Sequence, residues 1–220
     1  MLPRVLEPEV MDSEGEASDY DAMDHAAVNR LFVSDLLEFA SPLLSPVLDV
    51  GSGTAQIPIE LARRVDSVTV TAIDAAGAMI DLARRNVAAA GLDGRITTQL
   101  VNARRLPYPD GSFPAVISNS IVHHISEPLA VIAEIVRVTG RGGVIFVRDL
   151  ARPTDADTLR HLVNTYAGEA NAHQRKMFAE SLHAALTVEE VREWVAGFGF
   201  AAETVTLTSD RHWTWAAVRP

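Results

Sequence analysis

The chain has 220 residues, a formal net charge of −10 and 48% hydrophobic residues, which suits a single α/β domain with a sizeable core and short additions. Nucleic acids and anionic membranes bind basic faces, and Lys176 is the only lysine, so we expect neither as a partner. Without cysteine there can be no disulfide or thiolate metal site, and without an apolar run long enough for a membrane span or a signal-peptide pattern we expect a cytoplasmic protein.

The start of the chain is acidic. Residues 1–18 carry five carboxylates and two prolines, which predicts a solvated, flexible tail ahead of a single domain over 19–220. From Tyr20 to Phe39 apolar side chains recur at helical spacing, and Ser41-Pro42 closes this helix. The simplest interpretation is a helix that packs on the edge of a sheet.

A glycine turn follows the first predicted strand. The strand 47–50 leads into Gly51-Ser52-Gly53, and helical spacing resumes over 57–64. Glycines let the backbone turn tightly beside a ligand, and the helix N-terminus then presents unpaired N–H groups to that ligand. The next strand, 68–73, ends in Asp74, which can accept hydrogen bonds from the two hydroxyls of a ribose. The pattern predicts a site for a nucleoside-containing cofactor.

Strands and helices then alternate along the chain. After the first two strands, helices are expected at 77–90 and within 128–138, and strands at 96–101, near 113–118 and at 144–149. This rhythm predicts βαβ units, a parallel sheet and right-handed crossovers that place helices on both faces. Gly91 and Gly140 are interpreted as the residues that stop the helices before them.

The last third of the chain departs from this rhythm. Helical spacing over 151–186 predicts a helical insertion after the fifth strand. Thr187 and Glu190 form a capping-box pattern for the next helix, which is expected to end near Gly197. Strands at 204–207 and 213–218 then predict an antiparallel hairpin at the sheet edge, with two tryptophans on its core face.

The glycine turn and four later segments together resemble the motifs of class I S-adenosylmethionine (AdoMet) methyltransferases. In the first motif of that family, D/E-x-G-x-G-x-G, Asp49, Gly51 and Gly53 match, and Ala55 replaces the last glycine. A dinucleotide-binding turn would instead need a glycine at Gln56. The family's D-A-x-x-L-P-F, fourth-strand, L-H-H and E-x-x-R-V-L-x-P-G-G sequences resemble, in order, residues 102–108, 110–118, 121–125 and 134–143.

This resemblance covers residues 45–150 and implies a Rossmann-like class I methyltransferase fold. Such a fold has a mostly parallel seven-stranded sheet, helices on both faces and a C-terminal antiparallel hairpin. The resemblance further implies AdoMet as cofactor, S-adenosylhomocysteine as product and transfer to oxygen or carbon of a small molecule, as in quinone-biosynthesis methyltransferases. The fourth strand ends in Ser118-Asn119-Ser120 rather than the N-P-P-Y of methyltransferases acting on DNA, which argues against such substrates.

The resemblance also implies which residues bind the cofactor. Asp74 would hold the ribose, the glycine turn would surround the amino-acid part, and Asn102 occupies the position of the family's adenine-contacting acid. An amide oxygen can still accept a hydrogen bond from the adenine amino group. In related enzymes the N-terminal helix often folds over the cofactor, which adds Tyr20. The expected set is Tyr20, Asp49, Gly51, Ser52, Gly53, Asp74, Ala75, Met79, Asn102, Ala103 and Asn119.

The implied catalytic pair is His124 and Asp149. Some small-molecule O-methyltransferases that the chain resembles use the second histidine of L-H-H as a general base, oriented by an aspartate after the fifth strand. His124 and Asp149 occupy these positions, and His123 is interpreted as structural. A histidine held by a carboxylate keeps one tautomer, so its other nitrogen can take a proton. A preformed nucleophile would need neither residue, and no histidine spacing predicts a metal site.

Three functions are compatible with these patterns. The leading interpretation is a small-molecule methyltransferase, acting as a monomer or homodimer, in which the insertion 151–186 covers the acceptor as a lid. The second is a protein of the same fold that binds AdoMet or S-adenosylhomocysteine without transferring a methyl group. The third, an NAD-dependent oxidoreductase, is disfavoured by Gln56 and by the C-terminal hairpin.

Overall fold

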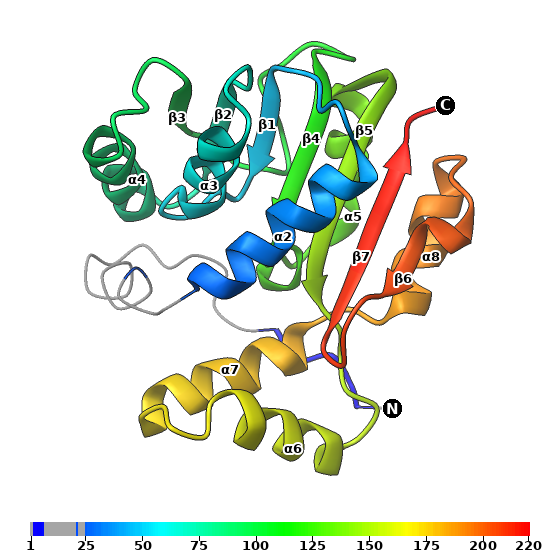
Figure 1. Cartoon of the computed structure of the whole chain (residues 1–220). Coiled ribbons are helices and arrows are strands. Elements are labelled where there is room, and N and C mark those ends of the chain that lie inside the picture. The colour runs from blue at the N-terminus through cyan, green and yellow to red at the C-terminus, as the bar shows by residue number, and fades with distance from the viewer. Residues whose placement is uncertain (1, 7–20, 22–24) are drawn as a thin grey trace.

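A seven-stranded mixed sheet organises the chain in the computed structural model, which describes residues 2–6, 21 and 25–220. The strands follow the order β3-β2-β1-β4-β5-β7-β6 (Figure 1). The first five are parallel to one another, whereas β7 runs antiparallel to both β5 and β6. The predicted fold, with its C-terminal hairpin, is confirmed. The strand bounds are β1 Val47–Val50, β2 Val70–Asp74, β3 Ile96–Leu100, β4 Phe113–Asn119, β5 Thr139–Leu150, β6 Val205–Leu207 and β7 His212–Val218.

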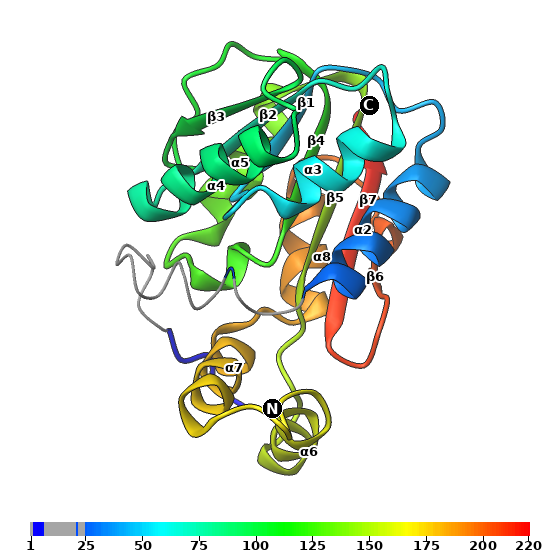
Figure 2. The same ribbon diagram turned by 60° about the vertical axis from the view of Figure 1, so that its left-hand side comes forward.

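Helices cover both faces of this sheet, as the alternation predicts. The first group packs around residues such as Phe32, Ile57 and Ala83 on one face (Figure 2). This group comprises α2 Ala26–Phe39, α3 Gln56–Arg64 and α4 Gly77–Ala89. The opposite face carries α5 Pro128–Val138 and α8 Val188–Gly197. Alternate strand residues therefore serve two separate cores, because successive side chains of a strand point to opposite faces.

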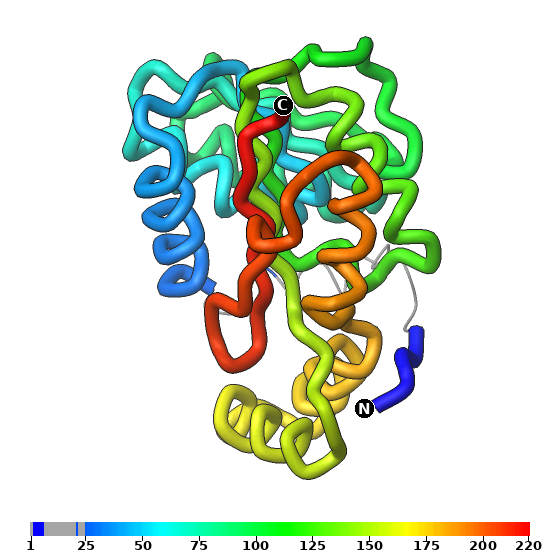
Figure 3. The backbone as a smooth tube through the Cα atoms, turned by 90° about the vertical axis from the view of Figure 1, so that its right-hand side faces the viewer, coloured from blue at the N-terminus to red at the C-terminus, as the bar shows by residue number. Residues whose placement is uncertain are grey.

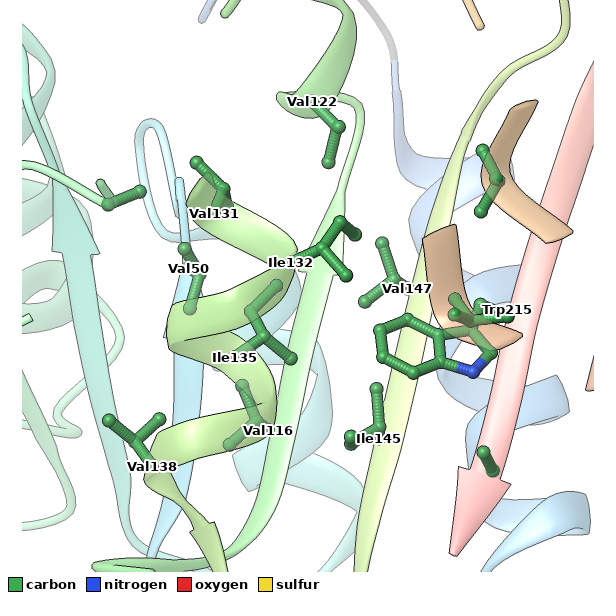
Figure 4. Packing of buried hydrophobic residues seen from close by; sticks show 14 of the residues in the cluster. Val50, Val116, Val122, Val131, Ile132, Ile135, Val138, Ile145, Val147 and Trp215 are labelled. Carbon is green, nitrogen blue, oxygen red and sulfur yellow. The ribbon is translucent and has the colours of Figure 1, made fainter. Parts of the chain in front are cut away.

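The core beneath α5 is entirely aliphatic and aromatic. Ile132 and Ile135 of α5 point toward Val116, Ile145 and Val147 of the central strands (Figure 4). At its far side the fully buried rings of Trp213 and Trp215 complete the same core. The prediction that the two tryptophans face the core is confirmed.

The expected helix ends are right at Gly91 and wrong at Gly140. Gly91 has φ +69°, and the N–H of Leu92 bonds to the carbonyl of Val87, a left-handed glycine stop. Gly140, in contrast, lies inside β5, which begins at Thr139 and not at residue 144. The strand starts early because Thr139 pairs with Phe113 on β4. Pairing between strands, which no local pattern reveals, decides this boundary.

The insertion forms two helices beyond the carboxyl ends of the parallel strands (Figures 1 and 3). These are α6 Ala156–Tyr166 and α7 Ala172–Ala184, which pack on each other through Leu162, Val163 and Leu182. An isolated parallel bridge between Ala151 and Leu186 closes the insertion at its base. At the far end of α6, the Tyr166 hydroxyl donates to Asp210 at 2.6 Å, and Arg211 lies over the tyrosine ring. We call this contact of Tyr166, Asp210 and Arg211 the α6 clasp.

Part of the predicted tail is held against the body. The N–H of Leu2 donates to Thr154 and that of Val5 to His183, both at 3.1 Å. The prediction of a free tail is therefore wrong for residues 2–6, because these backbone bonds and the side chain of Arg4 attach them to the insertion. The remaining acidic residues of 1–18 lie outside the described part of the chain.

Ala55 occupies a strained place in the turn between β1 and α3. It is the residue immediately before α3 and has φ +65°, a left-handed conformation that costs residues with a Cβ about 1 kcal/mol or more. Ala55 replaces the glycine that the AdoMet motif has there, so this chain bears a local strain that the motif's own glycine would not have.

We therefore expect Ala55→Gly to raise the free energy of unfolding by about 0.5–1 kcal/mol, measured by urea denaturation. The matched control is Ala88→Gly, on an exposed position of α4, which should lower it by about 1 kcal/mol, because glycine is the poorer helix former. A loss of stability in both variants would contradict the assignment of strain to Ala55.

Candidate active site

A cavity of about 440 Å³ lies at the carboxyl ends of β1, β2 and β4, where the order of the strands reverses. This is the place where open α/β sheets bind their ligands. Ten of the eleven predicted cofactor residues line it, and the remaining one, Tyr20, lies outside the described residues. The ten are Asp49, Gly51, Ser52, Gly53, Asp74, Ala75, Met79, Asn102, Ala103 and Asn119.

Asp74 ties the glycine turn to the end of β2. One carboxylate oxygen accepts the N–H of Gly53 and the other accepts that of Ala76, both at 2.9 Å. Burial raises the pKa of Asp74, and these backbone donors only partly oppose the rise. Each oxygen keeps a second lone pair, so the carboxylate can also accept from hydroxyls that reach the cavity. Asp74 therefore both shapes the turn and presents acceptors to a ligand.

Three buried polar atoms beside the turn have no hydrogen-bond partner among the residues that the structure describes. They are Oδ2 of Asp49, Oγ of Ser52 and Oγ1 of Thr54. All three residues line the cavity, and Asp49 is only 2% exposed. Buried polar groups without partners are costly, and such groups in a cavity point to a polar ligand that would satisfy them. The predictions missed Thr54, although it follows the glycine turn directly.

Burial, and then the negative charge of Asp74, raise the pKa of Asp49 to about 8. Near neutral pH the carboxyl of the ligand-free protein is therefore largely protonated. A cation bound beside it would favour the ionised form, because an opposite charge lowers the pKa of a carboxyl. The glycine turn thus offers a place where a positively charged group is stabilised.

Gly51 allows close packing between the glycine turn and the loop after β4. It has φ +74°, and a Cβ at this position would lie 2.2 Å from Cγ2 of Ile121. Ile121 also lines the cavity. A side chain at Gly51 would first displace Ile121, so a substitution there would disturb both the turn and the cavity wall.

Asn102 makes a local turn beside the cavity. Its Oδ1 accepts the N–H of Arg104 at 2.9 Å, and the residue is exposed on the adenine side that the resemblance implies. The loop that carries Asn102 is attached to α5. Glu134 of this helix accepts the N–H of Leu106, and Arg137 donates to the Leu106 carbonyl. One lone pair of Oδ1 thus remains for a ligand.

Asp149 bonds to His123, the neighbour of the histidine that it was predicted to orient. Its Oδ1 contacts Nδ1 of His123, and its Oδ2 accepts the N–H of Val122 at 2.6 Å. In the 3-10 turn η1, Val122–His124, the rings of His123 and His124 stack with their centroids 4.0 Å apart, and His124 acts on Asp149 through its charge. The orientation of His124 by Asp149 stays a prediction. His123 is buried at 3% exposure, as its structural interpretation requires, whereas His124 is half-buried and lines the cavity.

Burial alone would raise the pKa of Asp149, but the His123 ring and the N–H of Leu150 outweigh burial and lower it. The carboxylate therefore stays ionised inside the protein. It fixes the turn that presents His124 through the N–H groups of Val122 and His123.

The resemblance implies that the N-terminal helix folds over the cofactor, but it names only Tyr20 and none of the residues with which α2 and the segment before it form a wall of the cavity. Asp21, His25, Ala26 and Asn29 line the cavity. Asp21 also accepts hydrogen bonds from Gln56 and Asn86. The helical pattern from Tyr20 onward was the available signal, but only the tertiary structure shows which of its residues reach the cavity.

The described part of the chain contains no cluster of three or more histidine or acidic residues placed to hold a metal. None of its described helices combines the length and the apolar character that a membrane-spanning helix needs.

We expect the stability of the ligand-free protein to depend on pH through Asp49. The pKa of this group is about 8 in the folded chain against an ordinary 3.8, so its protonated form favours folding. Its contribution is complete below about pH 4 and is lost as the pH rises to about 8. Asp49→Asn, which cannot ionise, should therefore gain stability over the wild type between about pH 5 and pH 8 in urea denaturation.

Asp66→Asn is the control, because Asp66 is exposed on the surface and its substitution should have no such pH dependence. If the difference between Asp49→Asn and the wild type does not change with pH, the carboxyl of Asp49 is not buried in its protonated form.

Comparison with known proteins shows which proteins this chain is similar to. Residues 47–143 match the family model described as a methyltransferase domain. The chain is 30% identical over 121 residues to the ubiquinone/menaquinone biosynthesis C-methyltransferase UbiE of Geotalea daltonii. That match covers 54% of this chain and 51% of the relative, so it spans about half of each protein.

Two further proteins match over most of the chain. The 27-O-demethylrifamycin SV methyltransferase of Amycolatopsis mediterranei is 29% identical, over 93% of this chain and 73% of that protein. A crystal structure of a SAM-dependent methyltransferase from Aquifex aeolicus shares the fold with a TM-score of 0.68 and 18% identity, over 94% of this chain and 99% of that one. With its strand order and glycine turn, the chain has the fold of these methyltransferases, and residues 47–143 match a methyltransferase domain.

Proposed function

We propose that this protein transfers a methyl group from AdoMet to an oxygen or carbon atom of a small molecule. The observation that carries the proposal is the set of unpartnered polar atoms of Asp49, Ser52 and Thr54 in the same cavity as Asp74. Two relatives, the ubiquinone/menaquinone biosynthesis C-methyltransferase and the 27-O-demethylrifamycin SV methyltransferase, support a small acceptor and leave open whether its methylated atom is carbon or oxygen.

The residues of the cavity suit the parts of AdoMet. Asp74 has free lone pairs for ribose hydroxyls, and Asn102 and Ala103 lie at the adenine side. Asp49, Ser52 and Thr54 would satisfy the charged amino-acid end. When bound, AdoMet supplies a methyl group on a positively charged sulfur, which is open to in-line attack by a nucleophile.

The acceptor would lie between α2 and the loop after β4. His25 and Asn29 supply polar groups from α2, and Ile121 and Ile125 supply apolar walls from the loop. Such a mixture holds an organic molecule by its apolar surface and orients it by a few polar contacts. Orientation and exclusion of water are what the protein must provide, because the cofactor supplies the electrophile.

His124 is the group in this region that could take a proton from a hydroxyl acceptor. It lines the cavity on the turn that Asp149 fixes. Asp149 has a positioning role in this proposal: it holds His123 and the N–H groups of the turn, and thereby determines where His124 lies. A carbon nucleophile that is already activated would depend less on His124.

The insertion is proposed as a lid only in a conformation that differs from the described one. None of the residues 151–186 lines the cavity, although α7 packs against η1. To cover an acceptor, the insertion would have to move toward α2. Its helices are therefore best regarded as support for the loop that carries His124.

We expect Asp74→Ala to weaken the binding of S-adenosylhomocysteine by about tenfold to a hundredfold, or about 1.5–3 kcal/mol, in titration calorimetry. The substitution removes a charged acceptor and also frees the N–H of Gly53. Asp81→Ala, an exposed change on α4, should leave the affinity unaltered. Unchanged affinity in a folded Asp74→Ala protein would refute the assignment, and binding of NAD would refute the cofactor.

We expect His124→Ala to reduce turnover by about 10²–10⁴-fold while the affinity for S-adenosylhomocysteine stays within about twofold. His123→Ala should instead lower stability, because it leaves the buried Asp149 without its ring partner. The acceptor would be found by screening metabolite extracts with labelled AdoMet. Full turnover of His124→Ala between about pH 6 and pH 9 would exclude His124 as a general base. Tight binding of AdoMet by the wild-type protein without turnover of any acceptor would instead favour a regulatory AdoMet-binding protein.

A further inference from the structure

Arg4 reaches from the start of the chain to the loop that carries His124. Residues 2–6 run along the insertion, and backbone bonds from Leu2 to Thr154 and from Val5 to His183 fix the residues on both sides of Arg4. These bonds restrain the backbone around Arg4 and thereby limit where its guanidinium can lie. The family model covers 47–143 and does not include it.

The guanidinium joins two elements. Nε donates to the carbonyl of Ala184, the last residue of α7, at 2.7 Å. Nη2 donates to the carbonyls of His123 and Ile125 at 3.1 and 3.0 Å. The two carbonyls belong to the residues on either side of His124. A planar guanidinium with several fixed donors can hold such a set of acceptors in one geometry.

The turn η1 is thus held by opposite charges at its two ends. The N–H groups of Val122 and His123 bond to the Asp149 carboxylate, and the carbonyls of His123 and Ile125 bond to Arg4. This polarity matches the dipole of a helical turn, whose N–H end favours an anion and whose carbonyl end favours a cation. His124 lies between the two charges.

Burial lowers the pKa of Arg4, and the Glu190 carboxylate opposes this effect. An arginine remains charged at neutral pH even when its pKa is lowered. Hydrogen bonds from a charged donor are stronger at a partly buried site than at an exposed surface. The contact is therefore strong enough to restrain the turn.

We propose that Arg4 is a positioning residue for methyl transfer, which fixes the turn Val122–His124 from its carbonyl side and joins it to α7. The proposal rests on the proposed function, because it assigns Arg4 a role through His124. It makes the first residues of the chain part of the active-site framework, although they lie more than a hundred positions from His124 in the sequence.

The first test is hydrogen exchange of the full chain without ligand. In Arg4→Ala the amides of 122–126 should exchange about tenfold faster, or more, than in the wild type, and Arg4→Lys should show a smaller change. The matched control is Arg152→Ala. Arg152 also donates to a carbonyl at the end of α7, that of Ala185, and its other bond is to Glu190. Its loss should loosen α7 and should loosen 122–126 clearly less than Arg4→Ala does.

The second test observes His124 directly, by NMR of histidine-labelled protein, with His124→Gln used to assign its ring signal. Arg4→Ala should shift or broaden the His124 signal and leave that of His161, on the insertion, in place. Millimolar guanidinium ion should partly restore the wild-type signal in Arg4→Ala and have no effect on Arg152→Ala. In the acceptor assay, Arg4→Ala should lower kcat and leave KM for AdoMet within about twofold.

Unchanged exchange at 122–126 and an unchanged His124 signal in a folded Arg4→Ala protein would overturn the proposal. So would equal effects of Arg4→Ala and Arg152→Ala on the turn, because Arg4 would then act only by supporting α7. Failure of the proposed function would look different: the wild-type protein itself would not bind S-adenosylhomocysteine in calorimetry.

Discussion

Carboxylates buried at the carboxyl edge of the sheet must find donors in the loops around them, and this requirement shapes the site. Asp74 takes the N–H groups of Gly53 and Ala76, and Asp149 takes those of Val122 and His123. A buried negative charge is tolerated only with such partners. The loops that follow β1, β2 and β4 are therefore folded around fixed anions. The shape of the cavity between these loops is therefore set by hydrogen bonds within the protein and does not depend on a ligand.

The two anions serve different halves of the cavity. Asp74 orders the glycine turn, where the nucleoside and amino-acid parts of a cofactor would bind, and Asp149 orders η1 with His124. Asp49 completes the first half with a carboxyl whose pKa burial raises to about 8. In the proposed reaction the first half would receive the positively charged cofactor and the second half the acceptor. The opposing wall, α2, is attached separately: buried Arg148 lies over the rings of Phe32 and Phe146 and pairs with Asp35.

Much of this arrangement could be predicted from the sequence, because it depends on local patterns. Apolar alternation located the strands, and the order strand, glycine turn, helix placed Asp49 and Asp74 at one edge. What failed depends on contacts between distant segments. Gly140 lies in a strand because Thr139 pairs with Phe113, and Asp149 bonds to His123, whose ring stacks on that of His124. No spacing in the sequence indicates that Arg4 and α2 meet the loops of the sheet.

The insertion is held at points that lie outside the matched methyltransferase domain, which covers residues 47–143. Arg4 holds the end of α7, and the α6 clasp joins Tyr166 to Asp210 and Arg211 in the turn between β6 and β7. Because α7 packs against η1, these two contacts also set the position of the helices that support the turn of His124. Exchanging the insertion together with both contacts would keep this support intact, whereas exchanging the helices alone would remove the bonds that hold them in place.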